Sequence, residues 1–134
     1  MPELPEVEKC MRCLRIKWEG QHVTAFRFLS PGLRLPFPKV LQNLPTPIHI
    51  RQVFRKGKYI IFAGKKAGEG FVIHLGMSGN LRMVRKNLYK PCKHDHCVIE
   101  GDHDQVLVFK DVRRFGSLQT LQGAKKVLEP VFTV

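Results

Sequence analysis

Apolar residues recur every three or four positions near the start of the chain. After Pro5 they occupy positions i, i+3, i+4 and i+7, a spacing that places them on one face of a helix. These residues are Val7, Cys10, Met11 and Leu14, and the opposite face carries Glu8, Lys9, Arg12 and Arg15. The pattern predicts a helix that ends near residues 18–20, where the periodicity is lost and a glycine follows.

From His22 onward the apolar positions form short runs or alternate with polar ones, as in strands. We predict strands at 22–29, 48–54, 59–63, 71–75, 81–84, 97–100 and 105–110, with the last two joined as a hairpin. A turn at 30–32, a proline-rich stretch with little pattern at 33–47 and a loop at 64–70 separate them. The fold is therefore predicted to be mainly β with some α: an antiparallel β-sandwich with the N-terminal helix packed against it.

Composition and charge narrow the class of protein. The 134 residues suit one domain, and 43% hydrophobic with 25% charged residues is typical of a globular chain. The net charge of +12 is unusual and indicates a polyanionic partner, with nucleic acid as the leading candidate. A membrane surface is the alternative, but no segment resembles a basic amphipathic helix with a large apolar face.

The four cysteines are expected to be reduced. No secretory signal opens the chain and no apolar run approaches the ~18 residues of a membrane span, so we expect an intracellular protein. The cysteines occur as Cys10-x2-Cys13 and Cys92-x4-Cys97, the second pair alongside His94 and His96. Their spacing superficially suits a zinc site. We favour unpaired structural thiols and assign no metal ligands, because the first pair falls within the predicted helix and the second leads directly into a strand.

A proline in second position is the first candidate for chemistry. Removal of Met1 would leave Pro2 with a free secondary amine, and an α-amino group titrates near ~7.7–8.0, against ~10.4 for lysine. Such an amine forms a cationic iminium with an aldehyde-level carbon, and Glu3 and Glu6 could move protons beside it. The alternative is that this segment only begins a helix, with Pro5 near the first helical position.

Three further clusters lie on predicted turns or loops. Residues 55–59 form a basic turn, which is either simply solvated or holds Lys58 rigidly against a buried strand. Two glycines bracket Met77 within residues 74–79, so this methionine is either a core residue or exposed at a loop tip. Residues 111–116 place a phenylalanine beside two arginines, an arrangement that could wedge between bases while the arginines contact phosphate or a base edge.

Five segments, in order and spacing, resemble the N-terminal domain of formamidopyrimidine-DNA glycosylase, the bacterial base-excision enzyme that removes oxidised purines. They are Met-Pro-Glu-Leu-Pro-Glu-Val-Glu at 1–8, Gly-Lys-Tyr at 57–59, His-Leu-Gly-Met-Ser-Gly at 74–79, Lys-His-Asp-His at 93–96 and Asp-x-Arg-Arg-Phe-Gly at 111–116. The related endonuclease VIII branch usually lacks the methionine and Arg-Arg-Phe loops. The resemblance therefore favours the oxidised-purine branch.

The resemblance implies a catalytic role for three residues. Pro2 matches the nucleophile that attacks C1′ of the damaged nucleotide and forms a Schiff base. Glu3 matches the acid that assists ring opening and proton transfer. Lys58 matches the lysine that donates a proton during elimination and contacts the DNA backbone. The reaction implied is base excision followed by β,δ-elimination.

The resemblance also implies a DNA-contacting set. His74 and His94 match histidines that contact DNA. Met77, Arg113 and Phe115 match the side chains that fill the void left by the flipped nucleotide, with Arg113 facing the orphaned cytosine. An unstacked hole costs a few kcal/mol, which an apolar wedge and a guanidinium can partly offset.

The family enzyme also has a helix-two-turn-helix module and a C-terminal zinc finger, and neither matches residues 1–134. We expect no cofactor in this chain, because the family's zinc ligands belong to that second half, and we expect the domain linker to begin at 128–134. The chain would then be a fragment or a shortened product with impaired turnover. We expect damaged double-stranded DNA as the partner, and no membrane. We expect a monomer located in the bacterial cytoplasm, associated with the nucleoid. Two alternatives remain: a non-catalytic DNA-binding module and, on the Cys/His cluster alone, a structural or metal-binding protein.

Overall fold

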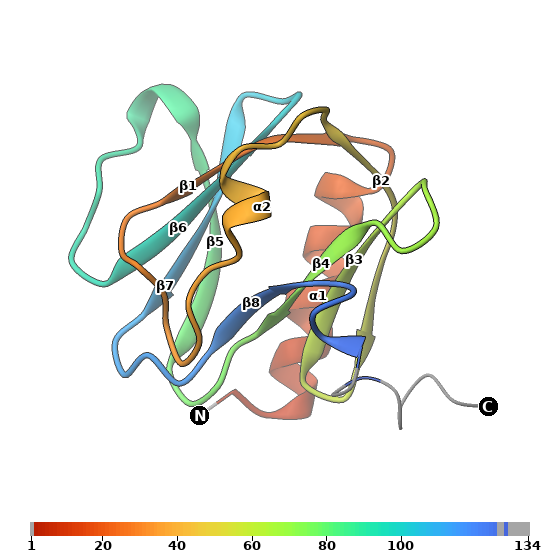
Figure 1. Cartoon of the computed structure of the whole chain (residues 1–134). Coiled ribbons are helices and arrows are strands. Elements are labelled where there is room, and N and C mark those ends of the chain that lie inside the picture. Colours follow the sequence, from red (N-terminus) through yellow and green to blue (C-terminus); the bar gives the residue numbers. More distant parts are fainter. Residues whose placement is uncertain (1, 126–127, 129–134) are drawn as a thin grey trace.

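Within the described part of the chain, the apolar runs form eight antiparallel strands. These strands lie in two layers (Figure 1). The computed structural model describes residues 2–125 and 128; Met1 and the expected linker segment, apart from Leu128, lie outside the described residues. The elements are α1 (Leu4–Trp18), β1 (His22–Phe28), α2 (Lys39–Gln42), β2 (Ile48–Lys56), β3 (Tyr59–Gly64), β4 (Gly70–His74), β5 (Gly79–Arg85), the 3-10 turn η1 (Lys86–Leu88), β6 (Asp95–Gly101), β7 (Gln105–Asp111) and β8 (Ser117–Thr120).

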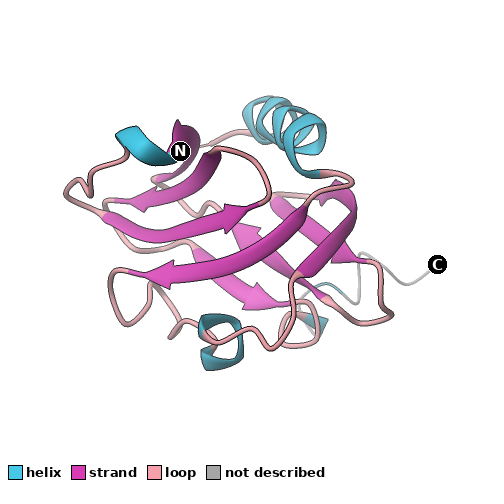
Figure 2. Ribbon diagram, turned by 90° about the horizontal axis from the view of Figure 1, so that it is seen from above, coloured by secondary structure: helices cyan, strands magenta, loops and turns pink. Residues whose placement is uncertain are grey.

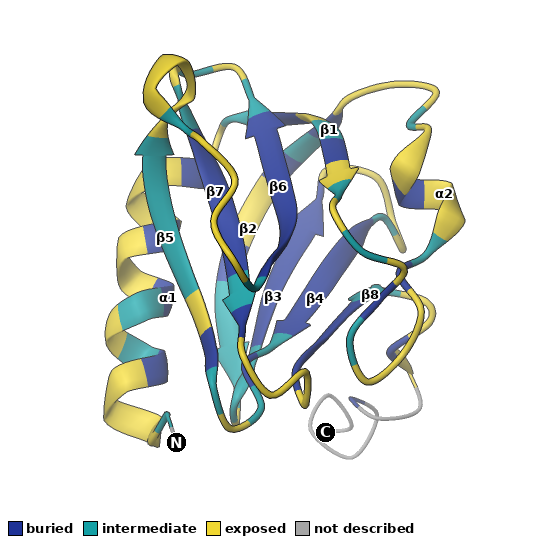
Figure 3. Ribbon diagram, turned by 90° about the vertical axis from the view of Figure 1, so that its left-hand side faces the viewer, coloured by how far each residue is buried: buried dark blue, intermediate teal, exposed yellow. Residues whose placement is uncertain are grey.

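The hydrogen-bonded order of the strands is β5-β7-β6-β1-β2-β3-β4-β8. Strands β1 and β2 pair at two positions, His22 with His49 and Val23 with Ile48, and the sheet turns at this short corner. Four strands then lie on each side of it in the hydrogen-bonded order. Figures 1 and 3 show how the two groups of strands are arranged. The predicted antiparallel sandwich with an N-terminal helix is confirmed.

Aromatic side chains fill the space between the layers. Phe71 of β4 stacks on Phe62 of β3 at a centroid distance of 4.5 Å and meets Phe26 of β1 edge-on at 5.0 Å. Phe26 and Phe71 come from opposite sides of the β1–β2 corner, so their contact joins the two halves of the sheet. They belong to one continuous buried cluster that also includes residues of α1.

Helix α1 covers a side of the sandwich with the face that its periodicity predicts (Figures 2 and 3). Its four buried residues are Val7, Met11, Leu14 and Trp18. The helix begins after Glu3, whose backbone N–H donates to the Glu6 carboxylate at 2.6 Å, as in a capping box. At its other end Trp18 packs edge-on against His103 of the β6–β7 hairpin, with a centroid distance of 4.6 Å.

Besides the 3-10 turn η1, two short elements were not predicted from the sequence. The stretch 33–47, expected to have little regular structure, contains α2, a single turn that buries Leu41. Strand β8 has a four-residue sequence with too few apolar positions to show a period, and it forms because it pairs along the outer edge of β4. Each depends on a contact distant in sequence.

The cysteines lie in different environments. Cys97 is fully buried in the core, Cys10 is half-buried against it, and Cys13 and Cys92 are exposed. Burial raises the pKa of the Cys10 thiol to about 11, with a smaller effect from the nearby Cys13. Within residues 2–125 and 128, no helix is long and apolar enough to cross a membrane.

The position of Phe71 gives a stability prediction. Phe71→Ala should lower the free energy of unfolding by about 3–5 kcal/mol, because it leaves a cavity where the two halves of the sheet meet. Ile16→Ala, on the solvent side of α1 and 82% exposed, should change it by no more than ~0.5 kcal/mol. Urea unfolding followed by circular dichroism measures both. Similar losses in the two variants would contradict this account of the core.

Candidate active site

The strand order brings two of the candidate loops together at one end of the sandwich. The β4–β5 loop carries Met77, and the β7–β8 loop carries Arg113 and Phe115. Strand β4 pairs with β8, and β5 pairs with β7. Each loop therefore runs from one of these two strand pairs to the other, so the loops lie side by side. Figure 1 shows them at the lower edge, together with the start of α1 and the β2–β3 turn.

The two loops contact each other through their backbones at a glycine. Gly76 has a φ of +61°, and a Cβ added there would lie 2.6 Å from the backbone nitrogen of Gly116. A side chain at this position would therefore force the loops apart. The glycine that the sequence places before Met77 is needed for this close approach.

A buried carboxylate holds both loops from below. Asp111 is fully buried, and its Oδ1 accepts hydrogen bonds from Ser78 Oγ at 2.6 Å and from the backbone N–H of Arg114 at 3.1 Å. Its Oδ2 accepts from the N–H of Gly116 at 2.8 Å, while Ser78 Oγ accepts from the N–H of Arg113 at 2.9 Å. Arg114 has a φ of +61°, an unfavourable conformation that these bonds stabilise.

The side chains at the tips of the loops are open to solvent. Met77 is 41% exposed and Phe115 is 46% exposed, so neither is a core residue. The guanidinium carbon of Arg113 lies 5.4 Å from the centre of the Phe115 ring, within range of a cation–π contact. The arrangement leaves two large apolar groups and a cation available to a partner.

Pro2 lies beside the methionine loop. It is half-buried and lines a groove of about 470 Å³ together with Glu6, Met77 and residues from the start of β5. Glu3 is exposed at the N-cap of α1. The segment thus begins a helix, as the alternative interpretation expected, and it also places the candidate nucleophile in a groove.

Lys58 and His74 form the next part of this end. Lys58 lies half-buried in the β2–β3 turn, and the ring of the adjacent Tyr59 is 4.6 Å from that of His74. Burial, and then the positive charges of Lys58 and Arg34, lower the pKa of His74. His74 Nδ1 accepts a hydrogen bond from the N–H of Gly76 at 3.1 Å, so the ring supports the start of the methionine loop.

His94 lies in the loop that precedes β6, with a φ of +71°. Its carbonyl accepts a hydrogen bond from the N–H of Asp111 at 3.0 Å, which places its backbone beside the phenylalanine loop. The neighbouring His96 is buried, with Nδ1 2.9 Å from Ser30 Oγ and Nε2 2.9 Å from the Asp111 carbonyl. The second histidine of the Lys-His-Asp-His segment is therefore structural.

The structure brings all eight candidate residues to this end of the molecule, although Lys58 does not line the Pro2 groove. The sequence did not identify Asp111 and Ser78 as the residues that hold the two loops. Both lie within segments that carry the family resemblance, at 111–116 and 74–79, but no role was assigned to them there. Among the described residues, no three His, Cys, Asp or Glu side chains lie close enough together to hold a metal ion.

The described strands form a sandwich of the class found in solved formamidopyrimidine-DNA glycosylases. The fold matches a Lactococcus lactis formamidopyrimidine-DNA glycosylase non-covalently bound to DNA with an AP site, with a TM-score of 0.78, 28% identity, and coverage of 96% of this chain and 49% of that one. MutM in complex with DNA containing carbocyclic 8-oxo-G matches with the same TM-score and 29% identity, over 96% of this chain and 49% of that one.

The chain belongs to the family of the formamidopyrimidine-DNA glycosylase N-terminal domain, whose model matches residues 1–118. It is 42% identical to the formamidopyrimidine-DNA glycosylase of Legionella pneumophila strain Philadelphia 1 over 116 residues, which are 87% of this chain and 41% of that protein. It is 44% identical to the enzyme of Dechloromonas aromatica over 120 residues, 87% of this chain and 42% of that protein. The chain thus spans about two fifths of the length of these curated relatives.

The Asp111 network predicts a coupled effect on both loops. Asp111→Asn should lower the free energy of unfolding by about 1–3 kcal/mol, because an amide NH₂ would face backbone N–H donors. Hydrogen exchange should rise in both 76–79 and 112–116, as measured by mass spectrometry. The matched control is Asp104→Asn, at an exposed aspartate, which should change neither quantity. Faster exchange in one loop alone would show that Asp111 does not couple them.

Proposed function

We propose that this chain is the catalytic N-terminal portion of a bifunctional DNA glycosylase that removes oxidised purines and then cleaves the abasic site. The observation that carries the proposal is the shared groove of Pro2 and Met77, which puts a candidate nucleophile beside a candidate wedge. Membership of the family and the DNA complexes of its solved relatives support the substrate class.

The chemistry begins at the Pro2 nitrogen, once Met1 is removed. The amine attacks C1′ of the damaged nucleotide, the bond from C1′ to the base breaks, and the base leaves with a proton. Glu3 assists opening of the sugar ring, which gives an iminium between Pro2 and C1′. Loss of a C2′ proton gives its electrons to the iminium, and the enamine so formed expels the 3′ phosphate. Loss of a C4′ proton from the resulting conjugated iminium then allows the 5′ phosphate to leave. Lys58 donates a proton during elimination.

DNA binding rests on charge and on the two loops. The net charge of +12 attracts phosphates, and Arg113, His74 and His94 lie at the catalytic end to contact the backbone or bases. Met77 and Phe115 enter the stack as the damaged nucleotide turns out of it, and Arg113 pairs with the orphaned base. This activity places the protein with the DNA of a bacterial cytoplasm.

Borohydride trapping tests the covalent step. Protein with a mass-verified free Pro2 should form a stable adduct with DNA carrying an abasic site, because reduction of the iminium fixes the bond to C1′. Pro2→Gly should abolish most of the adduct. Glu3→Gln should slow base removal by ~10²-fold and abasic-site cleavage by less.

The matched control for this experiment is Lys9→Gln, a charge removed from an exposed position on α1, which should trap as the native chain does. Absence of any adduct from protein with a free Pro2, combined with salt-sensitive DNA binding, would show instead a non-catalytic DNA-binding module.

The wedge assignment predicts a difference between substrates. Met77→Ala and Phe115→Ala should alter the free energy of unfolding by no more than ~0.5–1 kcal/mol, because both side chains are exposed. Each should lower trapping on duplex abasic DNA about tenfold, since a wedge offsets part of the few kcal/mol that flipping costs. Single-stranded abasic DNA needs no flipping and should be trapped nearly as well as by the native chain. Equal losses on both substrates would contradict a wedge role.

A further inference from the structure

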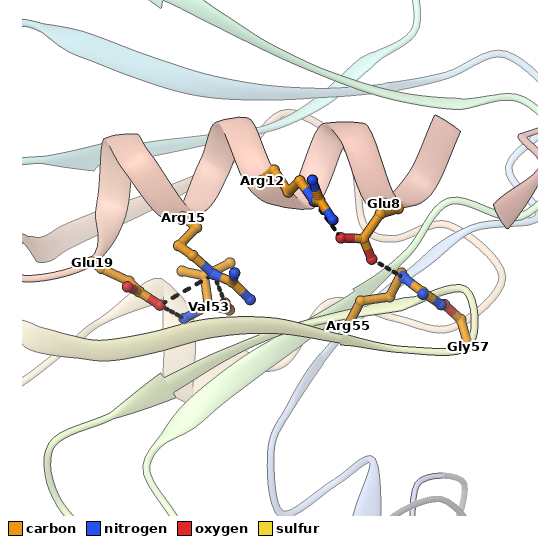
Figure 4. Close-up of polar contacts among 7 residues, drawn as sticks. All are labelled: Glu8, Arg12, Arg15, Glu19, Val53, Arg55 and Gly57. Carbon is orange, nitrogen blue, oxygen red and sulfur yellow. Dashed lines mark hydrogen bonds and ion pairs between the residues drawn. The ribbon is translucent and has the colours of Figure 1, made fainter. Parts of the chain in front are cut away.

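Helix α1 and strand β2 are joined at two places by polar side chains (Figure 4). At the C-terminal end of the helix, Arg15 Nε donates to the Val53 carbonyl at 3.0 Å and Glu19 accepts from the Val53 N–H at 2.8 Å. Nearer the helix N-terminus, Glu8 Oε1 lies 2.7 Å from Arg55 Nε. The second link is the one close to the candidate catalytic residues.

The Arg55 guanidinium makes two bonds at once. Besides the Glu8 carboxylate, its Nη1 donates to the carbonyl of Gly57 at 3.0 Å. Gly57 is the residue before Lys58 in the β2–β3 turn; it is exposed, and a Cβ built there would meet no atom within 4 Å. The Lys56–Tyr59 pair closes the hairpin, and on the exposed side of the turn the bond from Arg55 fixes the Gly57 carbonyl.

Glu8 has a second cationic partner that makes a different kind of contact. Its Oε2 lies 2.7 Å from Arg12 Nε, but the Arg12 side chain is 71% exposed against 27% for Arg55. A salt bridge this exposed contributes little. The hydrogen bond to Arg55, followed by that to Arg12, lowers the pKa of Glu8, so the carboxylate is ionised at neutral pH. Arg55 is the stronger partner and the one that reaches the turn.

We propose that Glu8 and Arg55 are positioning residues that fix the Lys58 turn against the helix that carries Pro2. The inference rests on the proposed function, in which Lys58 donates a proton to the reaction at Pro2. Glu8 lies on the helix that starts two residues after Pro2. Arg55 bonds both Glu8 and the Gly57 carbonyl, so it links the position of the turn to that of the helix. Displacement of a catalytic group by about 1 Å can cost ~10²-fold in rate.

The forked shape of arginine is essential to this role. A lysine at position 55 keeps the charge next to Glu8, but a single ammonium lacks the planar fork that bonds both Glu8 and the Gly57 carbonyl. Arg55→Lys should therefore lower the single-turnover rate of abasic-site cleavage about tenfold, while the affinity for DNA changes by less than twofold. In the Lys58→Ala background the same substitution should cause no further loss, since it acts through Lys58.

Two matched controls separate positioning from stability. Arg12→Ala removes the other ion pair of Glu8, and Arg15→Ala removes the arginine bond to Val53 at the far end of α1. Both should cleave within twofold of the native rate, even if Arg15→Ala lowers the melting temperature as much as Arg55→Lys does. Equal loss of activity in Arg15→Ala and Arg55→Lys would overturn the proposal, as would additive losses in the Arg55→Lys/Lys58→Ala pair.

A DNA-free measurement keeps this inference distinct from the proposed function. The charge of Lys58 contributes to the lowered pKa of His74, so NMR titration of the His74 ring reports where Lys58 lies. The pKa of His74 should rise in Lys58→Ala and in Arg55→Lys, and should not change in Arg12→Ala. A native chain that forms no adduct but gives this pattern would refute the function and support the positioning. An unchanged His74 pKa in Arg55→Lys, beside a raised one in Lys58→Ala, would refute the positioning.

Discussion

The burial of one face of α1 against the strands is the contact on which the candidate site depends. Val7, Met11, Leu14 and Trp18 anchor the helix over its whole length, so its first turn has a defined place relative to the strands. Pro2 precedes that turn by two residues and lines the groove together with the methionine loop.

Hydrogen bonds to a few buried or half-buried groups then fix the loops around this terminus. Asp111 joins the methionine and phenylalanine loops, and His74 supports the first of them. Arg55 joins the lysine turn to the helix. The large apolar tips of the loops gain no support from the core, so this polar framework sets where they point. Rigid support beneath exposed side chains is what a surface that enters a base stack requires.

The acidic residues are largely used within the fold. Glu100 is buried and paired with both Arg27 and Lys86, Asp95 binds Arg82 at 3.0 Å, and Asp102 binds His22 at 2.6 Å. These carboxylates therefore already have partners within the domain. The remaining excess of lysine and arginine gives the domain a positive field, which favours association with a polyanion before any specific contact forms.

Much of the fold and of the candidate site could be predicted from the sequence. Periodicity defined α1 and most strands to within two or three residues, because each buries a face whose spacing is visible in the chain. The loop residues Met77, Arg113 and Phe115 were identifiable because large apolar and cationic side chains beside glycines have few structural uses. Their proximity to one another was also expected, but only from resemblance to a family.

The tertiary structure alone decided that β8 and α2 form. It also decided which residues support the site: Asp111, Ser78, Glu8 and Arg55. An aspartate before two arginines looks solvent-exposed in the sequence, and only the crossing of two loops above it makes it a buried acceptor. Glu8 likewise lies on the polar face of a helix, and its partner is 47 residues away. The local sequence determines which side chains each element offers, but hydrogen bonds between distant elements exist only once the strands are paired, and those bonds set the geometry of the site.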